Sequence, residues 1–441
     1  MKRLSVLFMT CIFLLPIAGS LAAMDQPGGT ALERLKSPDA NIRAKAAREL
    51  GKIGDGPSIT ALKGALIDPE FKVRREVVLA LAAIHQPATL EPLAGASRDA
   101  DAGVRSLAIQ SIVGYYTGQI PGAGFTGFMK KNMQRAKSLF VDDETEIDPG
   151  VTVDPVVLAA LQNDLSDTRS VQVQRDAARG LGELMARQAV PDLVKAAHSS
   201  DDDLARQSIN SLTKIKDTSA GPQLIDLLDS RSKDVKRDAA VAVGILQARD
   251  ATAKLQLIFE NNPDKSTKEK ALEGLAYLGN PISVPLFSKE LWSPNKAFRV
   301  SAAEGLGRAG DPQNIPELQK AAIAEKDGDA RLAMQFGLTD LGKDDYLNTL
   351  IQQLNTKLRG DAAQAYLTEL SRNPEFLPKL YPYLNSNDAT VRRRLAAVLV
   401  FTGDRTSIAP LEKLTHDSNS DVASAALRAL RAIRARTAEK H

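Results

Sequence analysis

Cysteine is nearly absent from this chain. The sequence of 441 residues contains one, Cys11, which lies in an apolar segment at the N-terminus. If that segment is removed, the remaining protein can form no disulfide, no thiolate metal site and no cysteine nucleophile. Stability must then come from a packed core alone.

A net charge of one sign is also missing. The chain has 57 basic and 54 acidic residues, and loss of Lys2 and Arg3 with the N-terminal segment would leave 55 basic residues against 54 acidic ones. A balance this close to neutral gives no general electrostatic reason for binding to a nucleic acid. We therefore expect no nucleic-acid partner.

Motifs that carry chemistry are absent as well. The four histidines are scattered along the chain, and none is followed by glutamate: His85, His198, His416 and His441. The sequence contains no His-Glu-x-x-His helix, no Gly-x-Ser-x-Gly turn and no Walker-type glycine loop. We find no catalytic constellation and expect no cofactor and no metal.

The N-terminus has the layout of a secretory signal peptide. Lys2 and Arg3 precede an apolar run over 4–15, and Pro16 and small residues lead to a cleavage position after Ala22. The sequence therefore predicts a signal peptide over 1–22 and a periplasmic or secreted protein. The alternative is an uncleaved membrane anchor, since an apolar run over 4–24 is long enough to span a bilayer.

The rest of the chain is dominated by one short phrase, repeated mostly every 31 or 32 residues. The phrase has an acidic or small polar residue, then an apolar residue before a usually basic one, and then aliphatic residues at helical spacing. A repeat of this length is typical of a solenoid. The usually basic position recurs at Arg43, Arg74, Arg105, Gln174, Ala205, Lys236, Lys268, Arg299, Arg331, Arg392 and Ala423.

Each repeat predicts two helices. Four residues before the basic position stands a residue suited to cap a helix, such as Asp39 or Asp101. Apolar or small residues at one before, three after and seven after fall on one helical face. A turn with glycine follows, as at Gly54 or Gly279, and then a second apolar segment. Because neither helix can bury its stripe alone, the units must stack into an all-α superhelix of about 12 repeats.

The phrase from Asp39 to Asp55 resembles HEAT repeats, particularly the short bacterial type named after phycobilisome lyases. The stretch from Pro294 to Asp311 repeats it closely, and the pattern extends over roughly 30 to 436. The resemblance implies an α-solenoid over 23–441 and a ladder of hydrogen bonds between units made by the recurrent Asp and Arg columns. It does not imply one function, because this repeat serves many roles.

An insertion interrupts the period at about 117–150. The sequence between Arg105 and Gln174 is about 38 residues longer than one repeat, and it contains glycines, a predicted helix over 128–140 and then an acidic run. Insertions in repeat proteins often lie on the binding face. The alternative is a helix that packs on the solenoid with its charges solvated. The candidate partner-binding residues here are Phe125, Phe128, Lys130, Lys131 and Arg135.

A second irregularity lies at about 359–384. This degenerate unit has three prolines four residues apart, Pro374, Pro378 and Pro382, which should interrupt its second helix. The result could be a bend in the superhelix with buried aromatic residues, or an aromatic contact patch. We favour the bend.

These features favour a scaffold without enzymatic activity in the cell envelope, which binds a protein or peptide on its concave surface, on the insertion, or on both. We expect the second helices to line that concave surface, with candidate contacts at Lys63, Lys195, Lys289 and Gln319. One alternative is a lyase or isomerase of the phycobilin-lyase type. Another is an envelope assembly factor that contacts the membrane through the insertion.

Overall fold

The computed structural model describes residues 30–118, 147 and 150–438. Within these residues the protein is helical, and no strand is formed. The helices follow one another in pairs, so the predicted all-α solenoid is confirmed. The predicted signal peptide lies outside the described residues.

The first helix of each pair contains the repeated phrase, except in the degenerate unit. A short helix, α1 (Ala31–Arg34), precedes the first pair. These first helices are α2 (Ala40–Ile53), α4 (Phe71–Ile84), α6 (Ala102–Thr117), α9 (Val171–Glu183), α11 (Asp202–Ile215), α12 (Lys233–Ile245), α14 (Lys265–Leu278), α16 (Lys296–Arg308), α18 (Gly328–Asp340), α20 (Gly360–Leu370), α22 (Ala389–Thr402) and α24 (Ser420–Ala438).

The second helices are shorter, and many follow a single 3₁₀ turn such as η5 (Pro281–Ser283) or η6 (Pro312–Asn314). They are α3 (Gly56–Ala65), α5 (Leu90–Ala96), α8 (Pro155–Leu165), α10 (Val190–Ala197), the 3₁₀ helix η3 (Thr218–Asp229), α13 (Thr252–Asn261), α15 (Val284–Glu290), α17 (Ile315–Ala324), α19 (Leu347–Gln353), α21 (Leu377–Leu380) with η9 (Tyr381–Asn385), and α23 (Ile408–Leu414).

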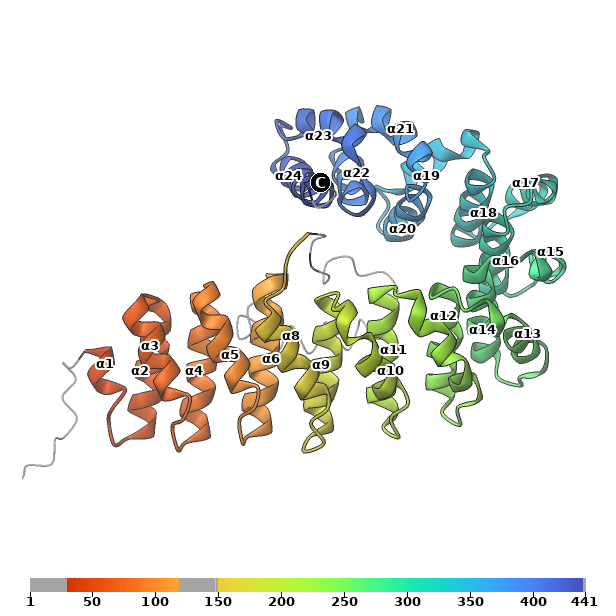
Figure 1. The fold of residues 1–441 in the computed structure, drawn as a ribbon. Helices are drawn as coiled ribbons and strands as arrows, with labels where there is room; N and C mark the ends of the chain where they lie inside the picture. The colour runs from red at the N-terminus through yellow and green to blue at the C-terminus, as the bar shows by residue number, and fades with distance from the viewer. Residues whose placement is uncertain (1–29, 119–146, 148–149, 439–441) are drawn as a thin grey trace, which may run out of the picture.

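The pairs stack into two arms joined by a bend (Figure 1). The units from α2 to α11 form one arm, and the units from α19 to α24 form the other. Between them, α12 to α18 turn the superhelix so that the second arm lies opposite the first.

At the bend the first helices lie on the inside. Figure 1 shows α14, α16 and α18 on the inner side and α13, α15 and α17 on the outer side. This arrangement corrects the prediction that the second helices line the concave surface. The sequence pattern shows which face of each helix is buried, but it does not show which layer is the more closely spaced.

Two pairs of glycines allow the first helices of the bend to approach closely. A Cβ atom added to Gly307 of α16 would lie 2.6 Å from the Cα atom of Gly337 in α18. Gly244 of α12 meets Gly274 of α14 in the same way. Glycine lets two backbones approach closely, so these first helices pack tightly, and Gly51 of α2 meets Ala80 of α4 in the same way outside the bend.

The caps and turns of the repeat follow the sequence closely. Asp39, Asp101 and Asp264 each accept a backbone N–H in the first turn of their helix, whereas Glu70 makes no such bond. Gly54 and Gly279 end their helices with φ of 68° and 55°.

The turn at Gly403 differs from this expectation, because its φ is −59°. The space around it is limited instead, since a Cβ atom there would lie 2.6 Å from Cδ1 of Ile433.

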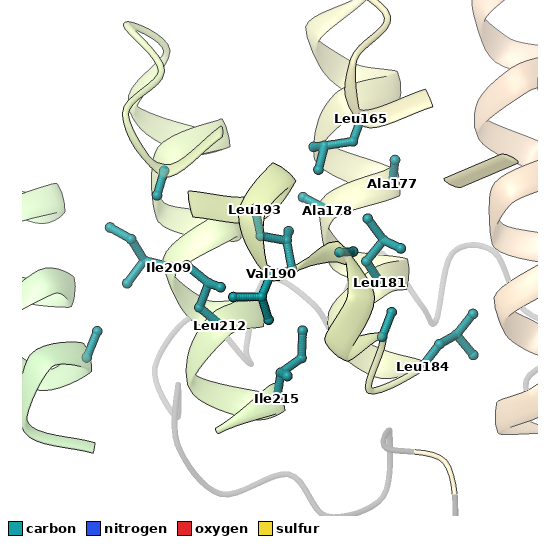
Figure 2. Packing of buried hydrophobic residues seen from close by; sticks show 14 of the residues in the cluster. Leu165, Ala177, Ala178, Leu181, Leu184, Val190, Leu193, Ile209, Leu212 and Ile215 are labelled. Atoms are coloured by element: carbon teal, nitrogen blue, oxygen red, sulfur yellow. The ribbon is translucent and has the colours of Figure 1, made fainter. Parts of the chain in front are cut away.

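A continuous apolar core lies between the two layers. In the α9–α11 region, Val190 and Leu193 of α10 lie between Leu181 of α9 and Leu212 of α11 (Figure 2). All four side chains are buried. Each second helix therefore fills the space between two successive first helices, as expected for stacked repeats.

A ladder of arginines links consecutive units along one edge. Arg74 donates from Nε and Nη2 to both carboxylate oxygens of Asp99, at 2.6 and 2.8 Å, and from Nη1 to the carbonyl oxygen of Asp68. Arg43 and Arg392 make the same pair with Asp68 and Asp417. The aspartates of the ladder lie two residues before the helix caps, so capping and linking are performed by different residues.

The chain leaves this pattern in the third unit, between α6 and α8. Helix α6 ends at Thr117 and α8 begins at Pro155, on either side of the predicted insertion. Before α8, the N–H of Ile147 donates to the carbonyl oxygen of Glu183 at 3.2 Å. Gly150, with φ of 90°, packs directly on Ala435 of α24. A short segment therefore connects the two arms.

In the degenerate unit, the second helix α21 is four residues long and continues as the 3₁₀ helix η9. Pro378 lies in the first turn of α21 and Pro382 in the first turn of η9. Phe376 is buried, and Tyr381 and Tyr383 pack partly buried against the core of the second arm.

Candidate functional site

Four of the residues proposed from sequence lie on the second helices. Lys63 lies on α3, Lys195 on α10, Lys289 on α15 and Gln319 on α17. The three lysines are exposed, and Lys63 forms an ion pair of 2.7 Å with Glu91 of the next unit. Because α15 and α17 lie on the outer side of the bend, Lys289 and Gln319 do not line its inner surface. The five candidates in the insertion, Phe125, Phe128, Lys130, Lys131 and Arg135, lie outside the described residues.

The inner side of the bend holds a cluster of titratable side chains that the sequence analysis did not single out. Helices α14, α16, α18 and α20 each contribute to it from the face turned away from the second helices. We call it the bend cluster, and its members are Glu273, Tyr277, Glu304, Arg308, Asp340, Tyr366 and Glu369.

Arg308 lies at the centre of the bend cluster. Its Nη1 donates to Oε2 of Glu304, one turn earlier in α16, at 3.0 Å. Its Nε and Nη2 donate to Oε1 and Oε2 of Glu369 at 2.7 and 3.0 Å. The Arg308 side chain is only 9% exposed. A buried guanidinium bound by two carboxylates in this way is held in one orientation.

These contacts skip one unit. Glu369 belongs to α20, whereas Arg308 belongs to α16, and α18 lies between them. The hydroxyl group of Tyr366, also on α20, donates to Oε1 of Glu304 at 2.5 Å. Side chains can reach past a neighbouring helix only where the layer curves tightly toward them. These two contacts therefore place the first helices on the inside of the bend.

Aromatic rings complete the surroundings of Arg308. The guanidinium carbon lies 4.5 Å from the centre of the Tyr277 ring and 5.2 Å from that of Phe336. Phe336 in turn stacks on Tyr366, with 4.3 Å between ring centres and 14° between ring planes. Cation–π attraction adds to the ion pairs in a site with little water.

Burial and mutual charge shift the ionisation of the bend cluster. Burial alone would lower the pKa of Arg308, but the Glu304 and Glu369 carboxylates outweigh it and raise that pKa above its ordinary value. Burial raises the pKa of Tyr366, and the negative charge of Glu304 adds to the effect. Burial likewise raises the pKa of Glu273.

Asp340, at the end of α18, has a different role in the bend cluster. Its side chain is accessible, but protein on several sides limits hydration of the carboxylate and raises its pKa to about 6, and the charge of Glu369 contributes. No hydrogen bond or ion pair to this carboxylate is formed within the described residues. Asp340 is therefore the member best placed to meet a group from outside.

The chemistry of the bend cluster favours binding and shape over reaction. Apart from Asp340, its carboxylates are bound by Arg308, Tyr366 and Lys270, and no activated nucleophile is formed among these described residues. No group of three or more histidine, cysteine, aspartate or glutamate side chains could hold a metal ion in the described part of the chain. Nor is any of its helices both long and apolar enough to cross a membrane.

A sequence signal for the bend cluster exists. Glu273 and Tyr277 stand five and nine residues after Lys268, and Glu304 and Arg308 stand at the same distances after Arg299. These positions lie opposite the buried stripe, so a polar residue there looks merely solvated. Only the curvature brings them together.

Comparison with known proteins assigns the repeat. A profile of HEAT repeats matches residues 30–113, 156–244, 252–339 and 344–431. The chain belongs to the HEAT-repeat family. The resemblance noted in the sequence is thereby confirmed, and the gap between the first two matched ranges contains the insertion.

Individual HEAT-repeat relatives are distant. The phycocyanobilin lyase subunit alpha of Nostoc sp. (strain PCC 7120) is 29% identical over 140 residues, which is 31% of this chain and 44% of that protein. The chain thus spans less than half the length of this relative.

Among solved structures, importin beta has a TM-score of 0.45 at 12% identity, over 91% of this chain and 64% of that one. The complex of CpcE and CpcF of phycocyanin lyase from Nostoc sp. PCC7120 has a TM-score of 0.34 at 21% identity, over 64% of this chain and 94% of that one.

Proposed function

We propose that this protein is a scaffold without enzymatic activity that binds a protein or peptide partner on the inner face formed by its first helices. The bend cluster carries this proposal. Contacts between α16 and α20 hold the inner face in one curvature before any partner arrives. A preformed surface binds with a smaller entropic cost than one that must be ordered on binding.

The layer of first helices suits a partner better than the layer of second helices. At the bend and in the second arm its face lies on the side toward the first arm, so a partner can contact several units at once (Figure 1). The surface also carries charged side chains that can select a partner by electrostatic complementarity.

Site-specific photocrosslinking tests the proposal. A photoreactive residue would be placed at Asp340 or Arg393 on first helices, and at Lys195 or Lys289 on second helices as matched exposed controls. We expect partner crosslinks at the first-helix positions to exceed those at the control positions several-fold. Equal or stronger crosslinking from the second helices would contradict the proposal.

A lyase of the phycobilin type is the second candidate, because the sequence match to a phycocyanobilin lyase subunit extends over 140 residues. The purified protein would be mixed with phycocyanobilin and its absorbance spectrum recorded. A spectral shift with turnover would favour a lyase, and an unchanged spectrum would favour the scaffold.

We further propose that the scaffold acts in the cell envelope, in the periplasm or outside the cell. The basis is the signal-peptide pattern over 1–22, with Lys2 and Arg3 before an apolar run. Fractionation of the native cells, followed by N-terminal sequencing, should recover a chain that begins at Ala23. A cytoplasmic chain that begins at Met1 would remove this part of the proposal.

A further inference from the structure

The N-terminal end of the first-helix layer has a surface of cations on α2 and α4. Lys45, Arg48 and Lys52 are spaced by three and four residues along α2, and all three are exposed. Lys72 and Arg75 are exposed one turn apart on α4. We call these five residues the N-terminal basic face.

The geometry of both helices turns these side chains away from the second helices. In α2, Ala46 and Leu50 point into the core with no more than 1% exposure, and in α4 Val73 and Val77 are fully buried. Lys45, Arg48 and Lys52 are spaced by three and four residues, so they lie together on the opposite side of the helix. The basic side chains therefore lie on the same face of the layer as the bend cluster.

Most of this charge is not neutralised within the protein. Arg48 pairs with Glu76 of α4 at 2.7 Å. Lys45, Lys52, Lys72 and Arg75 make no hydrogen bond or ion pair with any part of the chain that the structure describes. On α11, by contrast, Arg206 pairs with Asp238 of the next unit at 2.7 Å. Four of the five cations of the N-terminal basic face thus have no acidic partner within the described residues.

We propose that the N-terminal basic face binds an acidic peptide segment of the protein partner. The inference rests on the proposed function and adds the chemistry of the partner. Lys45 and Lys52 are separated by about 10 Å along the helix axis, and acidic residues three apart in an extended peptide span about 10 Å as well. The peptide carboxylates replace the intramolecular acidic partners that this end of the layer lacks.

Two other polyanions fit the same surface less well. A nucleic acid would extend beyond two units, and toward the bend the layer becomes acidic at Glu273, Glu304 and Asp340, which repels phosphates. A membrane surface would need apolar side chains beside the cations for insertion. Beside the cations of α4 lie Leu79, which is half-buried, and Phe71, which is 41% exposed, so little apolar surface is available for insertion.

Fluorescence anisotropy with a labelled ten-residue glutamate peptide tests the inference on the full chain. We expect binding that weakens as salt rises, because the cations are exposed and screened. The variant Lys45→Glu/Arg75→Glu should raise the Kd at least tenfold. The control Lys195→Glu/Lys289→Glu changes the net charge by the same amount on the second helices and should leave the Kd within about twofold.

Several results would overturn the inference. They are no binding of the glutamate peptide, equal loss in the two variants, or tighter binding of a 20-nucleotide single-stranded DNA or of vesicles with 30% phosphatidylserine. The neutral variant Lys45→Gln/Arg75→Gln, checked by circular dichroism, guards against a folding defect. If partner crosslinks persist at Asp340 and Arg393 while the glutamate peptide fails to bind, the inference of an acidic peptide segment is wrong, but the proposed scaffold function stands.

Discussion

At the scale of single residues, the guanidinium group of Arg308 lies between two carboxylates from units that are separated by a third. The Glu304 side chain is only 11% exposed, and Glu369 is 33% exposed, so the guanidinium replaces water mainly at Glu304. Removal of the guanidinium would leave both carboxylates without their counter-ion. The cost of breaking a buried ion pair in this way exceeds the net gain from forming it.

We therefore expect Arg308→Gln to lower the free energy of unfolding by about 3–5 kcal/mol. The control is Arg372→Gln, because Arg372 is exposed and its side chain makes no hydrogen bond or ion pair with the described residues. Its change should stay within about 0.5 kcal/mol. Urea denaturation followed by circular dichroism measures both variants. Equal losses would show that Arg308 does not hold the bend.

Asp164 of α8 provides a residue-scale prediction on pH. Its side chain is 3% exposed, and Oδ2 has no hydrogen-bond partner among the described residues. Burial raises the pKa of Asp164 to about 6 in the folded protein, from 3.8 for an exposed aspartate. The folded state therefore holds this proton more tightly than the unfolded state does.

Asp164 therefore leaves the free energy of unfolding at its full value below about pH 4, where it is protonated in both states. That free energy falls as pH rises from about 4 to 6 and stays at the lower value above that range. The asparagine of Asp164→Asn cannot ionise, so this variant should not show the fall of about 3 kcal/mol in the free energy of unfolding. Melting temperatures of both proteins between pH 4 and 8 provide the measurement. Parallel pH profiles for variant and wild type would refute the assignment.

At the scale of helices, glycine pairs set how closely the first helices approach. A Cβ atom on Gly307 would meet the backbone of α18, whereas a Cβ atom on Gly64 of α3 would meet nothing within 4 Å. The same substitution at the two positions should therefore act in opposite directions.

Gly307→Ala should destabilise the protein by about 1–3 kcal/mol through overpacking. Gly64→Ala should stabilise it by about 0.5–1 kcal/mol, because alanine loses less backbone freedom in a helix. Differential scanning calorimetry compares the two. A neutral or stabilising Gly307→Ala would mean that the α16–α18 contact yields without strain.

The arginine ladder acts between the loops that precede successive first helices. The side chains of Arg74 and Asp99 are 13% and 7% exposed. Although burial alone would raise the pKa of Asp99, the hydrogen bonds from Arg74 outweigh it and lower that pKa. Because the pKa of Asp99 is lower in the folded state, its ionised carboxylate stabilises the fold at pH values above its unfolded-state pKa. This stabilisation is lost as pH falls through the folded-state pKa.

Arg74→Ala should therefore weaken the junction between the units of α4 and α6 locally, with a cost of about 2–4 kcal/mol, as for other buried pairs that lose one partner. Hydrogen exchange should become faster at backbone amides near 68–74 and 99–105, while the second arm keeps its protection. The neighbouring Arg75→Ala, exposed and outside the ladder, is the matched control. Faster exchange over the whole chain would instead indicate a global loss of stability.

At the scale of the whole molecule, the bend determines the separation of the two arms. Spin labels on cysteines introduced at Lys52 and Glu412, with Cys11 replaced by serine, report that separation. We expect one narrow distance distribution for the wild-type background. Arg308→Gln should broaden it and shift it to longer distances, because α16 and α20 lose their direct contact. An unchanged distribution would show that other contacts, such as that of Gly150 with Ala435, hold the arms without Arg308.

The sequence by itself determined the repeat, its two helices, the caps and the buried stripe, because each depends on residues near one another in the chain. Asp39 and Gly54 could be assigned from local pattern alone. The cluster around Arg308 could not, since Glu369 is 61 residues away and on a unit that the pattern marks as degenerate. The candidates on the second helices were chosen for a concave surface that the first helices form at the bend.

Only the tertiary structure decided which layer faces inward. Curvature is the accumulated result of small differences in spacing between two layers, and close contacts at glycines of α12, α14, α16 and α18 are part of the packing at the bend. In the sequence, the same glycines are only small residues on a helix. Once the first-helix layer contracts, positions opposite the core become the inner surface, and their charges become neighbours.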